Sequence, residues 1–434
     1  MKRGFYTIMA AQFFSSLADN ALLIAAISLL IQISAPEWMT PLLKLFFGLS
    51  YVLLAAFVGA FADAMPKGRV MFITNLVKLV GCIMMLFGAH PLVAYALVGL
   101  GAAAYSPAKY GILTELLPAE ALVKANGWIE GLTVGSIILG TVLGGQLVGP
   151  HLSNAMLAFD FPVIDTGVET PPQAAICVIA VVYMIAAVIN LRIPDTGVRY
   201  SHQERNPARL IVDFAQCFAT LWRDKLGQIS LAVTTLFWGA GATLQFIVLR
   251  WASAALGLDL TQGATLQAVV AIGIAAGAVI AARVPLKKAL SVLPVGVAMG
   301  LLVMTLAFFN RNSIPPIVLE GFGMQIPLYM VVASVVLMMI GGLAGFFVVP
   351  MNALLQHRGH VLMSAGHSIA VQNFNENLSV LVMLCVYAML VRYDLSVPTI
   401  IILFGMFVVC SMGLVMRRHR MNLRRTDPLA LIRS

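Results

Sequence analysis

The sequence predicts an all-α membrane protein with about twelve transmembrane helices. Of its 434 residues, 60% are hydrophobic and only 10% are charged, whereas a soluble domain carries about 25% charged residues. Apolar runs of about 20 residues, the length that a bilayer core requires, recur along the whole chain. These runs are continuous rather than alternating, which excludes a transmembrane β-barrel.

Spans are expected wherever an apolar run is bounded by charged or Pro- and Gly-containing turns. The first run follows the N-terminal MKRG without a small-residue cleavage site, so we read it as a span rather than a cleaved signal. The expected spans are roughly 5–33, 41–64, 69–89, 91–114, 121–148, 171–191, 227–252, 264–283, 289–309, 325–349, 364–391 and 396–416.

The basic residues predict the orientation of these spans. Most of the 27 Lys and Arg residues fall at the two termini and in alternate loops, near 67–69, 192–225, 283–288 and 358. The other loops are acidic or neutral, with Glu37, Asp160, Asp165, Glu169, Asp259 and Glu320. By the positive-inside rule, both termini are cytoplasmic. The net charge of +9 then reflects topology and attraction to anionic membrane lipids, and no nucleic-acid partner is expected.

The longest polar stretch divides the chain into two sets of six spans. We expect a six-helix bundle at 1–192, a cytoplasmic linker at 193–226, a second six-helix bundle at 227–416 and a basic cytoplasmic tail at 417–434. Within the linker, Asn206 and Pro207 form a good helix start. Apolar residues then recur at helical spacing, which predicts an amphipathic helix on the cytoplasmic membrane surface; a simple linker is the alternative.

The sequence shows no arrangement of residues that is typical of catalysis or of cofactor binding. The five cysteines (Cys82, Cys177, Cys217, Cys385 and Cys410) are scattered and form no CxxC pair. His357, His360 and His367 flank a predicted cytoplasmic loop, a normal wet location for histidine. There is no phosphate-binding Gly loop and no nucleophile–His–Asp arrangement. The sequence therefore predicts a protein that is not an enzyme and holds no metal or cofactor.

One loop motif suggests a transporter fold. GAFADAMPKGRVMF, residues 59–72, resembles the cytoplasmic signature of the major facilitator superfamily. The resemblance implies that Gly59 allows close helix approach, that Asp63 caps or pairs across the two halves, and that Lys67 and Arg69 anchor the loop. Together they would form a charge latch that can close one face. The alternative is an ordinary positive-inside loop with a Gly turn.

Longer blocks indicate a narrower family. AQFFSSLADNALLIAA (11–26), GLGAAAYSPAKYGILTELLPAEALVKANGWIE (99–130), LFWGAGATLQF (236–246) and AVQNFNENLSVLVML (370–384) together resemble the bacterial lysophospholipid transporter family. The resemblance covers essentially the whole chain.

This family resemblance implies a multi-pass protein of the bacterial inner membrane. It would move lysophospholipids inward by alternating access, chiefly 2-acyl-glycerophosphoethanolamine, for re-acylation. We expect a monomer that works with a separate acyltransferase/acyl-ACP synthetase, because no HxxxxD acyltransferase pattern occurs. A proton-coupled exporter of drugs or small metabolites on the same fold is the alternative.

Charged residues within predicted spans are the candidate functional residues, since each needs a partner or a watery cavity. The superfamily resemblance implies that spans 1, 4, 7 and 10 line a central cavity, so we expect Asp19, next to Asn20, to face Lys109. Such a pair could be a switch or a static salt bridge. Glu130 is expected just behind Lys109. Lys78 is expected to be peripheral, snorkelling or pairing with Glu130.

The remaining candidates are an arginine and a set of amides. Arg250, near the outer end of span 7, could hold a phosphate with its guanidinium fork or snorkel at the interface. The family resemblance leads us to expect a basic residue where Gln245 stands, and Arg250 is a possible replacement. A polar cluster between helices comprises Asn126, Asn373, Asn375, Glu376 and Asn377, for which a structural role is the main expectation.

Overall fold

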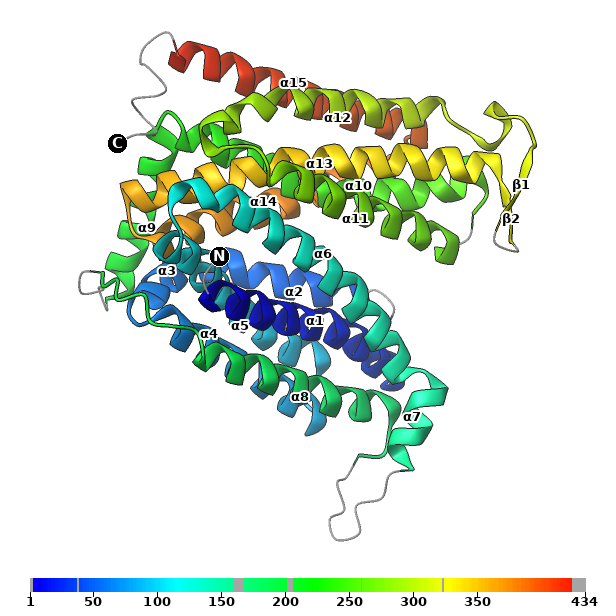
Figure 1. Ribbon diagram of the computed structural model, residues 1–434. Coiled ribbons are helices and arrows are strands. Elements are labelled where there is room, and N and C mark those ends of the chain that lie inside the picture. The colour runs from blue at the N-terminus through cyan, green and yellow to red at the C-terminus, as the bar shows by residue number, and fades with distance from the viewer. Residues whose placement is uncertain are drawn as a thin grey trace. The chain divides into compact units, whose positions relative to one another are not determined.

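A computed structural model describes residues 3–36, 39–158, 168–200, 206–258, 260–321 and 324–423. Within these ranges the chain forms fifteen α-helices, three short 3-10 helices and one two-stranded hairpin, so the all-α prediction is confirmed (Figure 1). The residues of these predictions that lie outside the described residues are Lys2, Glu37, Asp160, Asp165, Arg205, Asp259 and residues 424–434 of the predicted basic tail.

The predicted spans correspond to helices of the structure. Ten described helices are long and apolar enough to cross a membrane. An eleventh candidate is a pair of helices at 42–63 that is bent by 66°, and a shorter apolar helix covers Thr265–Ala281. These twelve segments match the twelve expected spans in order. The bend lies at Leu54, the single residue between the two helices of the pair.

The chain folds into two compact units. The first contains the described residues of 1–118, 135–220 and 362–374, and the second those of 119–134, 221–361 and 375–434. Four helices therefore contribute to both units, and they divide near residues 134, 220, 361 and 374. The predicted consecutive domains, with boundaries at 192 and 226, stay a prediction.

The first unit is built around helices from the first half of the sequence. Its helices are α1 (Arg3–Gln32), α2 (Met39–Leu53), α3 (Ala55–Asp63), α4 (Lys67–Leu86), α5 (Pro91–Leu116), α7 (Pro150–Leu157), α8 (Pro171–Leu191), most of α9 (Pro207–Arg223) and part of α6 (Ala119–Val148). Helix α4 packs on α5 and α8, and α1 packs on α8. Their shared core consists of small and aliphatic side chains around Tyr95 and Tyr183.

The second unit contains the later helices. They are α10 (Gly227–Leu256), α11 (Leu260–Ala281), α12 (Leu293–Thr305), α13 (Leu328–Leu362), most of α14 (Ala365–Arg392) and α15 (Val397–Leu423), with η1 (Leu286–Val292), η2 (Leu306–Phe308), η3 (Arg311–Ser313) and the hairpin of β1 (Val318–Gly321) and β2 (Met324–Pro327). The hairpin is antiparallel, with Val318 opposite Pro327.

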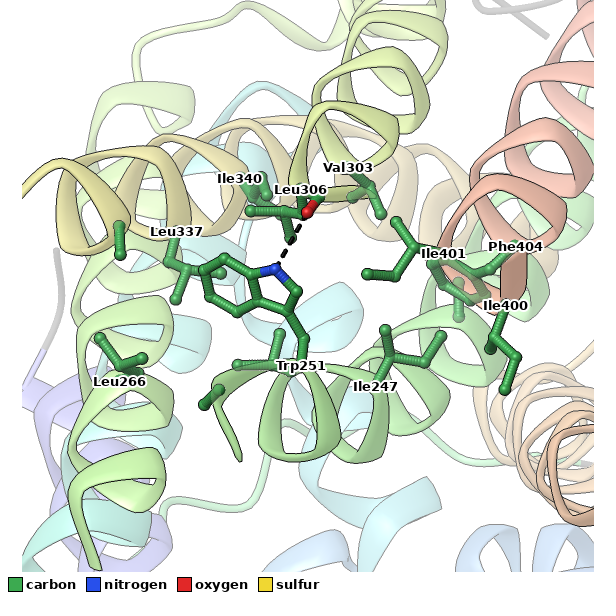
Figure 2. Packing of buried hydrophobic residues seen from close by; sticks show 14 of the residues in the cluster. Ile247, Trp251, Leu266, Val303, Leu306, Leu337, Ile340, Ile400, Ile401 and Phe404 are labelled. Carbon is green, nitrogen blue, oxygen red and sulfur yellow. Dashed lines mark hydrogen bonds between the residues drawn. The ribbon is translucent and has the colours of Figure 1, made fainter. Parts of the chain in front are cut away.

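Trp251 lies at the centre of the core of the second unit (Figure 2). Its indole is 1% exposed and is surrounded by aliphatic side chains from α10, α12, α13 and α15. The indole Nε1 donates a hydrogen bond to the carbonyl oxygen of Leu306 at 2.9 Å, where the helical hydrogen-bonding pattern of α12 tightens into η2. A buried indole needs such an acceptor, so this contact fixes how α10 sits on the end of α12.

Helices α11 and α13 approach each other backbone to backbone through glycine. A Cβ added to Gly277 would collide with the carbonyl of Gly342 and lie 2.9 Å from the Phe346 nitrogen. Without a strong hydrophobic drive between helices in lipid, close packing of small residues is what associates them. Glycine at this position is therefore required by the packing.

The amphipathic helix of the linker forms as predicted, and Asn206 caps it. The Asn206 side chain accepts a hydrogen bond from the Ala208 amide at 3.0 Å. Part of its apolar face rests on protein, because the rings of Phe214 and Phe218 pack edge-on against Phe374 at 5.5 and 6.1 Å. Exposed Ile211 and Val212 remain on its surface, so both the membrane-surface position and the linker role stay predictions.

Candidate functional site

A buried ion pair joins α1 to α4 within the first unit. The Lys78 ammonium lies 2.8 Å from both carboxylate oxygens of Asp19. The Lys78 side chain is 1% exposed and that of Asp19 is 20% exposed. One partner is thus enclosed by protein, while the other keeps an accessible edge.

Hydroxyl groups complete the surroundings of this pair. Tyr183 of α8 donates to Asp19 Oδ1 at 2.6 Å, and the Lys78 ammonium donates to the Ser15 hydroxyl at 3.1 Å. The ammonium also lies 5.1 Å from the ring centroid of Tyr105, within the range of a cation–π interaction. A buried ion pair is stable only with such additional partners.

This geometry corrects two predictions. Lys78 is buried and its partner is Asp19. The prediction of a peripheral lysine that snorkels or pairs with Glu130 was therefore wrong. Asp19 was expected to face Lys109, but its ion-pair partner is Lys78. The physical reason is helix rotation: α4 turns its Lys78 face toward α1, where Ser15 and Asp19 lie one turn apart.

Lys109 is nevertheless a buried cation in the middle of a helix. It is 8% exposed on α5, and its ammonium lies 4.1 Å from the ring centroid of Tyr110. Asn20, predicted to act beside Asp19, bonds within its own helix, because its amide donates to the Ser16 carbonyl at 2.8 Å. The functional roles of both residues stay predictions.

The predicted latch residue Asp63 lies at the N-terminus of α14, with Lys67 bound to it. The Asp63 carboxylate accepts hydrogen bonds from the ammonium of Lys67, from the hydroxyl of Ser364 and, at 3.1 Å, from the amide of Gly366. The His367 Nδ1 lies 3.1 Å from its Oδ2. A carboxylate at this position satisfies a free helix N–H group and the helix dipole.

Close helix approach makes this contact possible. A Cβ on Gly59 would lie 2.9 Å from the Cα of His367 and 3.2 Å from the Gly366 carbonyl. The predicted reason for Gly59, and the capping by Asp63, agree with this geometry. Arg69, by contrast, is exposed at the start of α4. Gating by this contact stays a proposal.

Glu115, which sequence reasoning missed, extends this charge cluster. Its carboxylate lies 3.6 Å from the Lys67 ammonium and is 3% exposed. It also accepts hydrogen bonds from Thr196 at 2.7 Å and Tyr200 at 2.9 Å. The sequence signal was available, since Glu115 is an acidic residue at the end of a span, but its partners are distant in the sequence.

Amide side chains connect α6 to α13 within the second unit. Asn126 and Gln356 exchange two hydrogen bonds, each 2.9 Å long, and Asn352 donates to the Glu130 carboxylate at 3.2 Å. These contacts agree with the structural role expected for the polar cluster. A position of Glu130 behind Lys109 stays a prediction.

Other members of the predicted polar cluster bond to different elements. The Asn373 amide donates to the Ser106 hydroxyl at 2.9 Å in the first unit. Asn375 accepts from the Trp222 indole at 3.3 Å in the second. Glu376 is 7% exposed, and Asn377 is next to it on α14.

Arg250 and Gln245 lie on α10, but their side chains differ in burial. Arg250 is half-buried, and its Nη1 is enclosed without a hydrogen-bond partner. Gln245 is exposed, and its backbone carbonyl accepts from the side chain of Gln267. The replacement by Arg250 of a family basic residue at the position of Gln245 stays a prediction.

A further pair missed in the sequence joins the linker to α13. Arg358, expected in a cytoplasmic loop, is 5% exposed in α13. Its guanidinium binds Asp224 at 2.7 and 3.2 Å, and Asp224 also accepts from the Gly227 amide at 2.7 Å. Among the described residues, no group of three or more His, Cys, Asp or Glu side chains could hold a metal ion.

Comparison with known proteins decides the family. The family model described as Major Facilitator Superfamily matches residues 8–383. A protein of Yersinia enterocolitica serotype O:8 / biotype 1B, named lysophospholipid transporter LplT, is 43% identical over 404 residues, which cover 92% of this chain and 90% of that protein. The chain belongs to the lysophospholipid transporter family of the Major Facilitator Superfamily. The protein of the same name from Yersinia pestis strain Pestoides F is 42% identical over 402 residues, with the same coverage.

Solved structures support the superfamily fold of this transporter. A variant of the Escherichia coli fucose:proton symporter FucP matches with a TM-score of 0.68 and 12% identity, covering 97% of this chain and 99% of that one. A bacterial homologue of the iron transporter ferroportin matches with a TM-score of 0.65 and 14% identity, covering 98% and 99%. At these identities the likeness concerns the fold alone.

Proposed function

We propose that this protein transports lysophospholipids, chiefly 2-acyl-glycerophosphoethanolamine, inward across a bacterial inner membrane. The observation that carries the proposal is the 43% identity, over 92% of the chain, to a protein named lysophospholipid transporter. Inward transport would deliver the lipid to a separate acyltransferase/acyl-ACP synthetase. We further propose that the protein is a monomer. The basic loops favour an orientation with both termini in the cytoplasm.

The buried charges supply the chemistry that a zwitterionic headgroup needs. Asp19 keeps an accessible edge while paired with Lys78, so it can meet an ammonium group. Lys109 offers a cation for a phosphate, and a guanidinium such as that of Arg250 can bind phosphate through two parallel N–H groups. We propose each of Asp19, Lys109 and Arg250, taken separately, as a candidate substrate-binding residue. We propose Asn20, Gln245, Asn126 and Glu130 as further candidate residues for substrate binding or gating.

The Asp63 contact is proposed as the gate on the cytoplasmic side. It connects α3, from the first half of the sequence, to α14, from the second half. A carboxylate that is 0% exposed loses several partners at once if α14 departs. Opening therefore has a substantial energetic cost, which suits a contact that forms in one state of an alternating-access cycle and breaks in another.

The test is uptake of radiolabelled lysophosphatidylethanolamine into proteoliposomes, normalised to inserted protein. We expect saturable uptake, strong reduction in Lys109→Ala and no change in Lys44→Ala, an exposed lysine that serves as the matched control. Diacyl phosphatidylethanolamine should compete poorly, because a second acyl chain needs more room. Uptake that ignores lysophospholipid but follows a soluble solute and collapses with a protonophore would favour the exporter instead.

A further inference from the structure

Residues 193–200, which we call the strap, are folded onto the first unit rather than hanging as a free linker. The Asp195 carboxylate accepts from the Gly197 amide at 3.0 Å, and Gly197 has a φ of 76°, a left-handed conformation that favours glycine. Arg199 binds the same carboxylate at 2.9 and 2.7 Å, and these contacts lower the pKa of Asp195. The strap therefore has a defined turn of its own.

The strap presents two hydroxyl groups to a single buried carboxylate. Thr196 donates to Glu115 Oε2 at 2.7 Å, and Tyr200 donates to Glu115 Oε1 at 2.9 Å. Each oxygen of Glu115 thus receives one hydrogen bond from the strap. Burial, and then the neighbouring Glu115 charge, raise the pKa of the Tyr200 phenol, so this hydroxyl keeps its proton at physiological pH.

Lys67 lies between the carboxylates of Glu115 and Asp63. Its ammonium binds Asp63 and the Ala62 carbonyl directly, but lies 3.6 Å from Glu115. It also lies 4.9 Å from the ring centroid of Tyr200, a cation–π distance. Two carboxylates therefore compete for one ammonium, and Asp63 has the closer contact.

We propose that Thr196 and Tyr200 are positioning residues that keep the Asp63 latch closed. By satisfying Glu115, the strap leaves Lys67 with Asp63, which holds the N-terminus of α14. Without the two hydroxyl groups, Glu115 would be a buried charge short of partners, and it would draw Lys67 away from Asp63. The link to transport rests on the proposed function, whereas the link from strap to latch does not.

The experiment measures latch opening without any substrate. Ala370 of α14 is 1% exposed and packs against Val58 of α3, so a cysteine at 370 is shielded while the latch is closed. In a variant with the five native cysteines replaced, the reaction rate of A370C with N-ethylmaleimide reports opening. We expect T196V/Y200F to react about tenfold faster, a factor that corresponds to about 1.4 kcal/mol. Tyr393→Phe, at an exposed tyrosine, is the matched control and should react at the parent rate.

A second variant separates positioning from general loosening. Glu115→Gln removes the charge that attracts Lys67, so T196V/Y200F should no longer accelerate the reaction in that background. An unchanged rate in T196V/Y200F, or an equal acceleration with Glu115→Gln present, would overturn the proposal. If A370C behaves as expected but no variant takes up lysophosphatidylethanolamine, the proposed function fails while the strap inference stands.

Discussion

Removing Lys78 should destabilise the protein because it leaves Asp19 without its ion-pair partner. Breaking a buried pair by truncating one side costs about 3–5 kcal/mol. Asp19 is 20% exposed and keeps the Tyr183 hydrogen bond, so Lys78→Met should lower the free energy of unfolding by about 3 kcal/mol. Asp19→Asn leaves Lys78, which is only 1% exposed, without its partner. This change should lower the free energy of unfolding by about 5 kcal/mol.

The double variant is the decisive member of this series. With neither charge present, no buried group lacks a partner, so Asp19→Asn with Lys78→Met should be more stable than the sum of the singles by about 2–3 kcal/mol. Unfolding midpoints of purified protein in detergent, followed by tryptophan fluorescence, give the order. Lys44→Met is the control at an exposed lysine. A Lys78→Met midpoint equal to wild type, or additive singles, would show that the pair contributes nothing.

Three further predictions follow from the packing and the charge pattern. Gly277→Ala should lower the unfolding midpoint, because the added Cβ would collide with the backbone of α13. Gly241→Ala is the control, since a Cβ there meets open space, and it should leave the midpoint unchanged. Equal midpoints would contradict the close α11–α13 packing. Trp251→Phe should cost about 2–4 kcal/mol through the lost hydrogen bond and cavity, measured by denaturant unfolding, and a cost below about 1 kcal/mol would contradict its central place in the core. A cysteine at Tyr393 should react with a membrane-impermeant thiol reagent added outside cells, and one at Arg199 should not; the reverse pattern would overturn the predicted orientation.

Span positions could be predicted well because length and hydropathy alone determine them. All twelve expected segments correspond to helices, and the break at Leu54 falls inside the expected span 41–64. The two-unit division could not be predicted from loop length, since α6 and α14 each contribute to both compact units. Which neighbours a helix packs against depends on tertiary contacts that no linear pattern contains.

The ion pair shows what the sequence signal contained and what was missed. Ser15 and Asp19 are one turn apart on α1, and Asn75 and Lys78 are one turn apart on α4. Such polar stripes mark the faces that meet, and the Ser15 hydroxyl does bond to the Asn75 side chain at 2.9 Å. Matching the two stripes would have paired Asp19 with Lys78. By contrast, the partners of Glu115 depend on the turn of the strap, which has no periodic signal.

The direct test of the central claim is initial-rate uptake of lysophosphatidylethanolamine by purified protein in proteoliposomes, compared with protein-free vesicles. The account predicts saturable, protein-dependent uptake that diacyl phosphatidylethanolamine does not inhibit and that Lys109→Ala lowers severely. Uptake at the protein-free rate, or equal inhibition by the diacyl lipid, would contradict it.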